Sequence, residues 1–122
     1  MKLYIANAFS LSMLTKPKVL LHVQEITVDE AQRLIKNIEA RSKTSQARII
    51  SAVGHESTAR VLSTLLNYNI PMNRIPIQLE TNDILLVFQL MQRLPEGAVL
   101  TEDELRLLQY KLYKVTVKEP LL

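Results

Sequence analysis

The sequence contains no cysteine and only two histidines, His22 and His55, which lie far apart along the chain. Without cysteine there is no disulfide, no thiolate nucleophile and no thiolate-bound metal, and the lack of disulfides agrees with a reducing cytoplasm. Two separated histidines also argue against a zinc site. We therefore expect a protein that uses no metal and no cofactor.

Long hydrophobic runs are missing as well. No apolar stretch approaches the roughly 18 residues that a membrane-spanning helix needs, and residues 1–7 turn polar too soon for a secretory signal. The chain also lacks a Gly-x-x-x-x-Gly-Lys loop, a Gly-x-Gly-x-x-Gly fingerprint and a Gly-x-Ser-x-Gly elbow. We expect a soluble cytoplasmic domain without membrane contact and without those nucleotide-binding or nucleophile motifs.

The composition that remains is that of an ordinary globular protein. The 122 residues are 48% hydrophobic and 22% charged, which predicts one domain over 1–122. The 15 Lys and Arg against 12 Asp and Glu leave a formal net charge of +3. This balance tolerates an anionic ligand, but proteins that hold long DNA through its phosphates usually carry a denser basic stripe. Long nucleic acid is therefore not an expected partner.

Hydrophobic periodicity predicts strands that alternate with helices. Two of the expected helices begin with Thr followed three residues later by Glu, the spacing of a capping box, at Thr27 and Thr101. Pro76 cannot donate a ladder hydrogen bond, so its strand should be bulged or lie at an edge. The pattern predicts an α/β fold, a mixed sheet of about five strands flanked by helices, with strands expected over 3–6, 19–26, 47–53, 75–79, 84–91 and 113–118 and helices over 28–41, 57–66 and 102–108.

The most informative stretch joins the strand ending at Val53 to the next helix. Gly54 permits a sharp turn, and Ser57 or Thr58 could cap the helix or reach a phosphate oxygen. A strand, a turn and a helix start aim backbone N–H groups at an anion. His55 places a titratable proton donor beside that site. A lone histidine is more often structural, as we expect for a half-buried His22, but this context favours a catalytic His55.

Two further groups of polar residues follow predicted strands. Gln89, Arg93 and Glu96 come at the end of the most apolar strand, where open α/β sheets tend to bind ligands. Arg93 suits a bidentate grip on phosphate, and Glu96 could orient His55 or accept a proton. The alternative is a solvated turn with an Arg–Glu pair.

The remaining candidates have simpler alternative explanations. Asn7 and Ser10 lie on the loop after the first strand, where such side chains often satisfy loop backbone groups. Arg74 belongs to an Asn–Arg turn pair and could be a surface charge. Taken together, the residues predict a metal-independent site built from histidine, arginine and backbone amides that faces an anion.

Several short motifs occur in the same order in the viral ring nucleases, anti-CRISPR proteins with relatives in some bacterial genomes, and the chain resembles this family over nearly its whole length. The resemblance is weakest over 19–47, and Glu56 and Pro95 stand where the family more often has Asp and Glu. The matching motifs are Asn7-Ala8-Phe9-Ser10, Met13-Leu14, Gly54-His55-Glu56-Ser57-Thr58, Asn73-Arg74, Gln92-Arg93-Leu94-Pro95-Glu96-Gly97 and Leu100-Thr101.

The resemblance implies a homodimer that encloses cyclic tetra-adenylate and cuts it, without a metal, into linear di-adenylates with 2′,3′-cyclic phosphate ends. It implies that His55 is the general acid for the 5′-oxygen and that Glu96 is a supporting acid/base. It further implies substrate contacts by Arg93, Ser10, Gln89, Asn7 and Arg74. Two alternatives remain open: a non-catalytic nucleic-acid-binding or regulatory protein, and a sensor that binds the cyclic ligand without cutting it.

Overall fold

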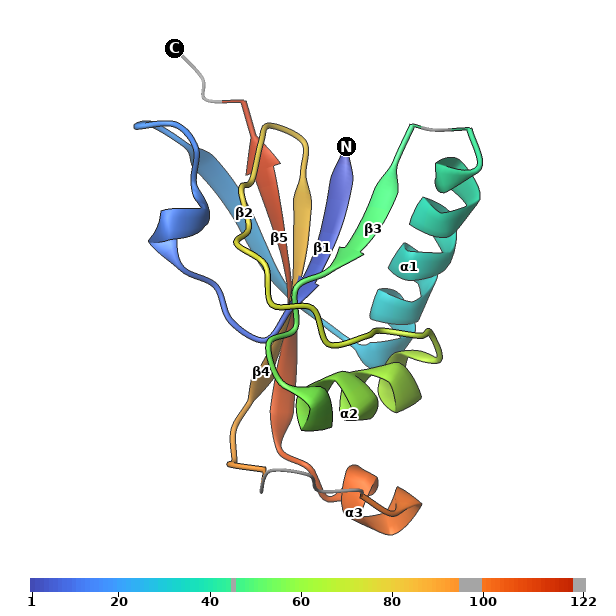
Figure 1. The fold of residues 1–122 in the computed structure, drawn as a ribbon. Helices are drawn as coiled ribbons and strands as arrows, with labels where there is room; N and C mark the ends of the chain where they lie inside the picture. Colours follow the sequence, from blue (N-terminus) through green and yellow to red (C-terminus); the bar gives the residue numbers. More distant parts are fainter. Residues whose placement is uncertain (45, 95–99, 120–122) are drawn as a thin grey trace.

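The computed structural model describes residues 1–44, 46–94 and 100–119 (Figure 1). Along the chain the elements are β1 (Lys2–Ala6), the 3-10 helix η1 (Leu11–Met13), β2 (Leu20–Ile26), α1 (Val28–Ser42), β3 (Arg48–Ser51), α2 (Glu56–Leu66), β4 (Ile84–Leu90), α3 (Glu102–Arg106) and β5 (Tyr110–Lys118). No helix in these ranges is long and apolar enough to cross a membrane.

The five strands form one sheet in the order β2-β5-β4-β1-β3. β1 pairs in parallel with both β3 and β4, whereas β5 pairs antiparallel with β4 and β2. This confirms the predicted α/β fold with a mixed sheet of about five strands. β4 is buried over its first five residues, as expected for a central strand.

The strand predicted over 75–79 is wrong. Only an isolated parallel bridge forms there, between Leu14 and Leu79, with the Leu79 N–H donating to the Met13 carbonyl at 2.8 Å. Pro76 has no N–H to offer a ladder, so the segment crosses a face of the sheet instead of joining it. Its side chains Ile77 and Leu79 are buried against that face.

The last strand and His22 also differ from expectation. β5 begins at Tyr110, three residues before the predicted start at 113, and lies inside the sheet between β2 and β4. β2 is consequently an edge strand whose side chains are mostly exposed. His22 is exposed rather than half-buried because it lies on that edge.

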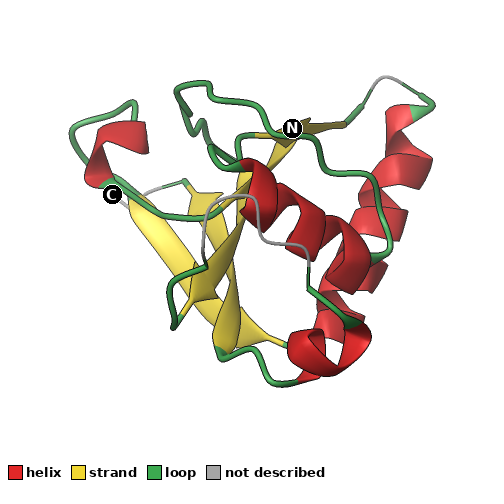
Figure 2. Ribbon diagram, turned by 60° about the horizontal axis from the view of Figure 1, so that its bottom comes forward, coloured by secondary structure: helices red, strands yellow, loops and turns green. Residues whose placement is uncertain are grey.

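The two faces of the sheet are covered differently. α1 and α2 pack on one face, where α1 buries Ala31, Ile35 and Ile38 at the predicted helical spacing (Figures 1 and 2). Loops and the short 3-10 helix η1 cover the other face, where segments 9–19 and 71–83 bring Met13, Ile77 and Leu79 against the strands.

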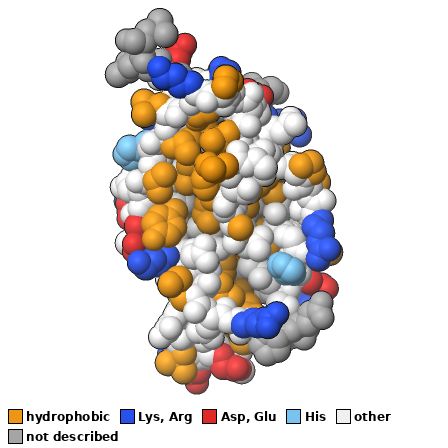
Figure 3. Space-filling view, turned by 90° about the vertical axis from the view of Figure 1, so that its left-hand side faces the viewer, with side chains coloured by type: hydrophobic (Ala, Val, Ile, Leu, Met, Phe, Trp, Pro, Cys, Tyr) orange, Lys and Arg blue, Asp and Glu red, His pale blue; other side chains and the backbone are white. Residues whose placement is uncertain are grey.

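The loop-covered side of the molecule leaves hydrophobic side chains in contact with solvent. Figure 3 shows them gathered over the middle of this side. Leu11 of η1 is 75% exposed, and Val23 of β2, which pairs with the buried Val115 and so shares its face, is 58% exposed. Exposed hydrophobic patches on other proteins often mark contact surfaces.

Candidate functional site

Three parallel strands bring the predicted site residues to one edge of the sheet. Because β3, β1 and β4 are parallel neighbours, their carboxyl ends meet. Asn7 directly follows β1, Gly54 and His55 follow β3, and Gln89 lies next to the end of β4. Open α/β sheets place ligands in the crevice beyond such strand ends.

A cavity of about 530 Å³, here called the anion cavity, lies at this edge. Ser10 is not in its lining: it is the N-cap of η1, where its hydroxyl accepts from the Ser12 N–H at 3.3 Å. Glu96 falls outside the described residues. The other predicted residues all line the cavity, namely Asn7, Gly54, His55, Ser57, Thr58, Arg74, Gln89 and Arg93.

The start of α2 contributes most of one wall. His55 is the N-cap residue, with an extended backbone at φ −131° and ψ 134°, and its side chain makes no capping hydrogen bond to the described chain. Ser57 and Thr58 are buried in the first turn after this N-cap, so neither is the N-cap residue, and their contact with a phosphate remains a prediction. The exposed imidazole is thus available to a ligand beside the positive end of the helix dipole.

Gly54 was expected to permit a sharp turn, but the structure shows no need for a glycine there. Its backbone is outside the left-handed region, and a Cβ built there would lie 3.5 Å from the Arg74 Cγ, an ordinary van der Waals contact. The turn therefore needs no glycine for its backbone dihedrals. A missing Cβ matters at this position only for the close approach of another group.

Residues 71–74 hold the loop between β3 and α2 in place, a role that the sequence did not reveal. The Asn73 N–H donates to the Val53 carbonyl at 2.9 Å, and its side-chain amide donates to the Ser51 carbonyl at 2.7 Å. Arg74 Nε donates to the Gly54 carbonyl at 3.0 Å, and the Gly54 N–H donates to Asn7 Oδ1 at 3.4 Å. The backbone before His55 is therefore fixed from several directions.

The charges at the anion cavity favour a negatively charged ligand. Arg74 and Arg93 both line it and are exposed to solvent. The carboxylate of Glu56 also lines it, but Arg60 Nη2 binds Glu56 Oε1 at 2.8 Å, an i,i+4 pair. Two guanidinium groups, a helix N-terminus and an imidazole can hold a phosphate and deliver a proton to it.

The described residues offer no obvious place for a metal ion. Across 1–44, 46–94 and 100–119, no three His, Cys, Asp or Glu side chains are grouped so that they could hold one. The absence of a metal requirement remains a prediction.

Comparison with known proteins places the chain in a family. The family described as STIV B116-like matches residues 3–112. The chain belongs to the STIV B116-like family. B116 of Sulfolobus turreted icosahedral virus has the same fold, with a TM-score of 0.80 and 27% sequence identity over 95% of this chain and 99% of B116.

Relatives of this B116-like chain occur in viruses and in a bacterium. Uncharacterized protein 26 of Sulfolobus islandicus filamentous virus (isolate Iceland/Hveragerdi) is 39% identical over 91% of this chain and 87% of its own length. Uncharacterized protein YddF of Bacillus subtilis (strain 168) is 32% identical over 76% of this chain and 80% of its own length. The predicted kinship with viral proteins that have bacterial relatives is confirmed.

Proposed function

We propose that this B116-like protein is a metal-independent phosphodiesterase, a ring nuclease that cuts cyclic tetra-adenylate into linear di-adenylates with 2′,3′-cyclic phosphate ends. Its activity would shut off type III CRISPR signalling in the cytoplasm of the cell that contains it. The observation that carries the proposal is the convergence of His55, Arg74 and Arg93 on one cavity at the start of α2, where the His55 side chain makes no capping hydrogen bond to the described chain.

The proposed chemistry uses a nucleophile that the substrate already contains. The ribose 2′-oxygen attacks the neighbouring phosphorus, the new O2′–P bond closes the cyclic phosphate, and the P–O5′ bond breaks. Glu96, the proposed supporting acid/base, takes the proton that the 2′-hydroxyl loses, and His55 donates a proton to the leaving 5′-oxygen. The protein needs only to align the three atoms and to stabilise charge on the phosphate. Proton donation of this kind is worth about 10²- to 10⁴-fold in rate.

The proposed substrate contacts come from elements that the sheet brings together. Gln89 lies in β4, Arg93 lies just after it, and Asn7 follows β1. Arg74 holds the loop between β3 and α2 through its Nε. The Nη atoms of Arg74 extend beyond that hydrogen bond and are proposed to reach the phosphate. Ser10, on the same loop as Asn7, is proposed to contact the ligand once it is bound.

A homodimer is part of this proposal. Cyclic tetra-adenylate has repeated nucleotides, so a two-fold axis can present equivalent phosphates to two copies of His55. The hydrophobic side chains exposed on the loop-covered side, Leu11 and Val23 among them, support a contact between copies (Figure 3).

The decisive experiment incubates the protein with cyclic tetra-adenylate in the presence of EDTA and follows the products by chromatography. Wild type should yield di-adenylates with cyclic phosphate ends. His55→Ala should lose cleavage by about 10²-fold or more while it still binds the ligand. His22→Ala is the matched control, since His22 is exposed on the edge strand β2 and should retain full activity.

Each failure of this experiment has a separate meaning. Cleavage by His55→Ala at the wild-type rate would refute the general-acid mechanism. Binding without cleavage by wild type, in single-turnover conditions, would favour a sensor. Indifference to the cyclic ligand, together with affinity for long duplex DNA that falls steeply with salt, would favour a nucleic-acid-binding protein.

A further inference from the structure

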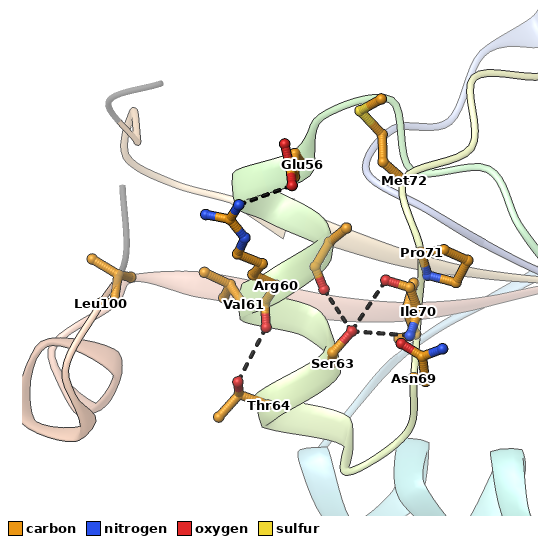
Figure 4. A pocket seen from close by; sticks show the side chains of 11 residues that line it. Glu56, Arg60, Val61, Ser63, Thr64, Asn69, Ile70, Pro71, Met72 and Leu100 are labelled. Atoms are coloured by element: carbon orange, nitrogen blue, oxygen red, sulfur yellow. Dashed lines mark hydrogen bonds and ion pairs between the residues drawn. The ribbon is translucent and has the colours of Figure 1, made fainter. Parts of the chain in front are cut away.

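A second cavity lies beside α2 and is lined by this helix, by the chain after it and by Leu100 (Figure 4). This helix groove has a volume of about 730 Å³, and Glu56 and Met72 line both cavities. The anion cavity accounts for a phosphate and a ribose, but a nucleotide also carries a base. A base attached to a phosphate in the first cavity would have to enter an adjoining space.

The lining of the helix groove matches the chemistry of a nucleobase. Pro71, Met72 and Leu100 contribute apolar surface, while Asn69 and Thr64 contribute amide and hydroxyl groups. Small-molecule sites combine apolar walls with a few polar groups in this way, and volumes of about 300–1,000 Å³ are typical. A purine offers two flat apolar faces and a hydrogen-bonding edge, so both kinds of lining have a partner.

Met72 is held in position at the junction of the two cavities. On one side of it the Pro71 carbonyl accepts from Ser51 Oγ at 2.6 Å, and on the other the Asn73 N–H donates to the Val53 carbonyl at 2.9 Å. Its side chain is nevertheless 51% exposed. A methionine sulfur makes favourable contacts with aromatic rings. The backbone is thus fixed while the thioether remains open to a ring.

The wall beyond Met72 is tied to α2 as well. The Ile70 N–H donates to Ser63 Oγ at 2.9 Å, and that hydroxyl lies 3.1 Å from the Ile70 carbonyl and 2.8 Å from the Ala59 carbonyl. The dashed lines of Figure 4 mark these bonds. The groove is therefore formed before a ligand arrives, which lowers the ordering cost of binding.

We propose that the helix groove binds the nucleobase of a nucleotide whose phosphate occupies the anion cavity, with Met72 against the face of the base. This inference rests on the proposed function, which supplies adenine as the base. It makes Met72 a specificity-determining residue that distinguishes a nucleotide from a bare phosphodiester.

The test measures the equilibrium affinity of wild type and variants for two probes that cannot be cut. One probe is a linear di-adenylate with a 2′-O-methyl group, and the other is the same backbone without bases. Met72→Ala should lower the affinity for the base-containing probe about 5- to 20-fold and leave the affinity for the abasic probe unchanged. Met72→Leu should restore most of the affinity. Met91→Ala, equally exposed at 56% on the chain after β4, should change neither probe.

The outcomes separate this inference from the function on which it rests. If Met72→Ala binds both probes as wild type does, or weakens both equally, the base site is wrong. Cleavage of cyclic tetra-adenylate by wild type in that case would leave the proposed function standing. If wild type neither binds the abasic probe nor cleaves the cyclic ligand, the proposed function is wrong. The base site is then wrong as well, because it rests on that function.

Discussion

The two long helices begin in opposite ways. At the start of α1 the Thr27 hydroxyl accepts from the Glu30 N–H at 3.1 Å, and the Glu30 carboxylate accepts from the Thr27 N–H at 3.0 Å. At the start of α2 the N-cap residue is His55, and its side chain makes no capping hydrogen bond within the described chain. The first helix satisfies its own N-terminus, whereas the second presents its N-terminus to a cavity.

This difference indicates which of the two helix N-termini is better suited to bind an anion. A capping box occupies donors that would otherwise face solvent, and its carboxylate repels a second anion. At α2 the first-turn carboxylate of Glu56 is instead engaged by Arg60, and Arg74 and Arg93 add positive charge nearby. α1 therefore closes its own N-terminus, whereas at the start of α2 the His55 side chain makes no capping hydrogen bond within the described chain, as the proposed function requires.

Closing the start of α2 should produce the largest effect. His55→Ser places a good N-cap residue at this position and should raise the free energy of unfolding by about 0.5–1 kcal/mol, because a serine hydroxyl satisfies a first-turn N–H. The same change removes the proton donor, so cleavage should fall about 10²- to 10⁴-fold. Thermal unfolding and the cyclic tetra-adenylate assay check the two parts. A variant that is both less stable and fully active would overturn the comparison.

Removing one cation near the start of each long helix should reduce cleavage less, and unequally, since Arg93 lines the cavity at the start of α2 and Arg33 belongs to α1. Arg93→Ala should reduce cleavage by roughly 10- to 100-fold, because a charge-assisted hydrogen bond to the phosphate is lost. Arg33→Ala is the matched control: Arg33 is exposed one turn into α1, where its Nε lies 3.4 Å from the Asp29 carbonyl. Steady-state kinetics on both variants should show a loss for Arg93 alone. Equal losses would mean that only the net charge matters.

The features that the sequence predicted well depend on neighbours along the chain. The capping box at Thr27 and the buried stripe of Ala31, Ile35 and Ile38 are both present as expected. The meeting of Asn7 and His55 at one edge is explained by the parallel pairing of β1 and β3, which end together, whereas the sequence linked the two residues only through the family resemblance. Local spacing carries this information because helix and strand periods are fixed by backbone geometry.

The features that were missed depend on contacts between distant parts of the chain. The Asn73 side chain donates to the Ser51 carbonyl, twenty-two residues away, and the sequence around Asn73 does not predict that bond. The segment around Pro76 has the alternation of a strand, but its one β-bridge in the described residues joins Leu79 to Leu14. The interpretation of Gly54 failed differently, because a glycine in a turn does not always adopt the left-handed backbone that only glycine favours.

Opening the start of α1 should affect stability and leave the activity alone. Thr27→Ala removes the hydroxyl that accepts from Glu30 N–H, and the free energy of unfolding should fall by about 1 kcal/mol. In a domain of this size that corresponds to a fall of several degrees, about 3–6 °C, in the midpoint of thermal unfolding. Cleavage of cyclic tetra-adenylate below that temperature should be unchanged. A loss of activity without a loss of stability would show that α1 also serves the site.

The smallest expected effect is the pH dependence of the stability that the capping box of α1 provides. The Thr27 N–H that donates to the Glu30 carboxylate holds the pKa of Glu30 below its ordinary value of 4.5. Because the pKa is lowered in the folded state, the stabilisation is complete above about pH 4.5 and is lost as the pH falls below that value. Glu30→Gln keeps an acceptor for Thr27 but does not titrate, so its unfolding midpoint should fall less than that of wild type on acidification. Asp29 is a neighbouring acid outside the capping box, so Asp29→Asn should keep the wild-type pH dependence of the unfolding midpoint. If Asp29→Asn also weakens that dependence, the capping box is not its cause.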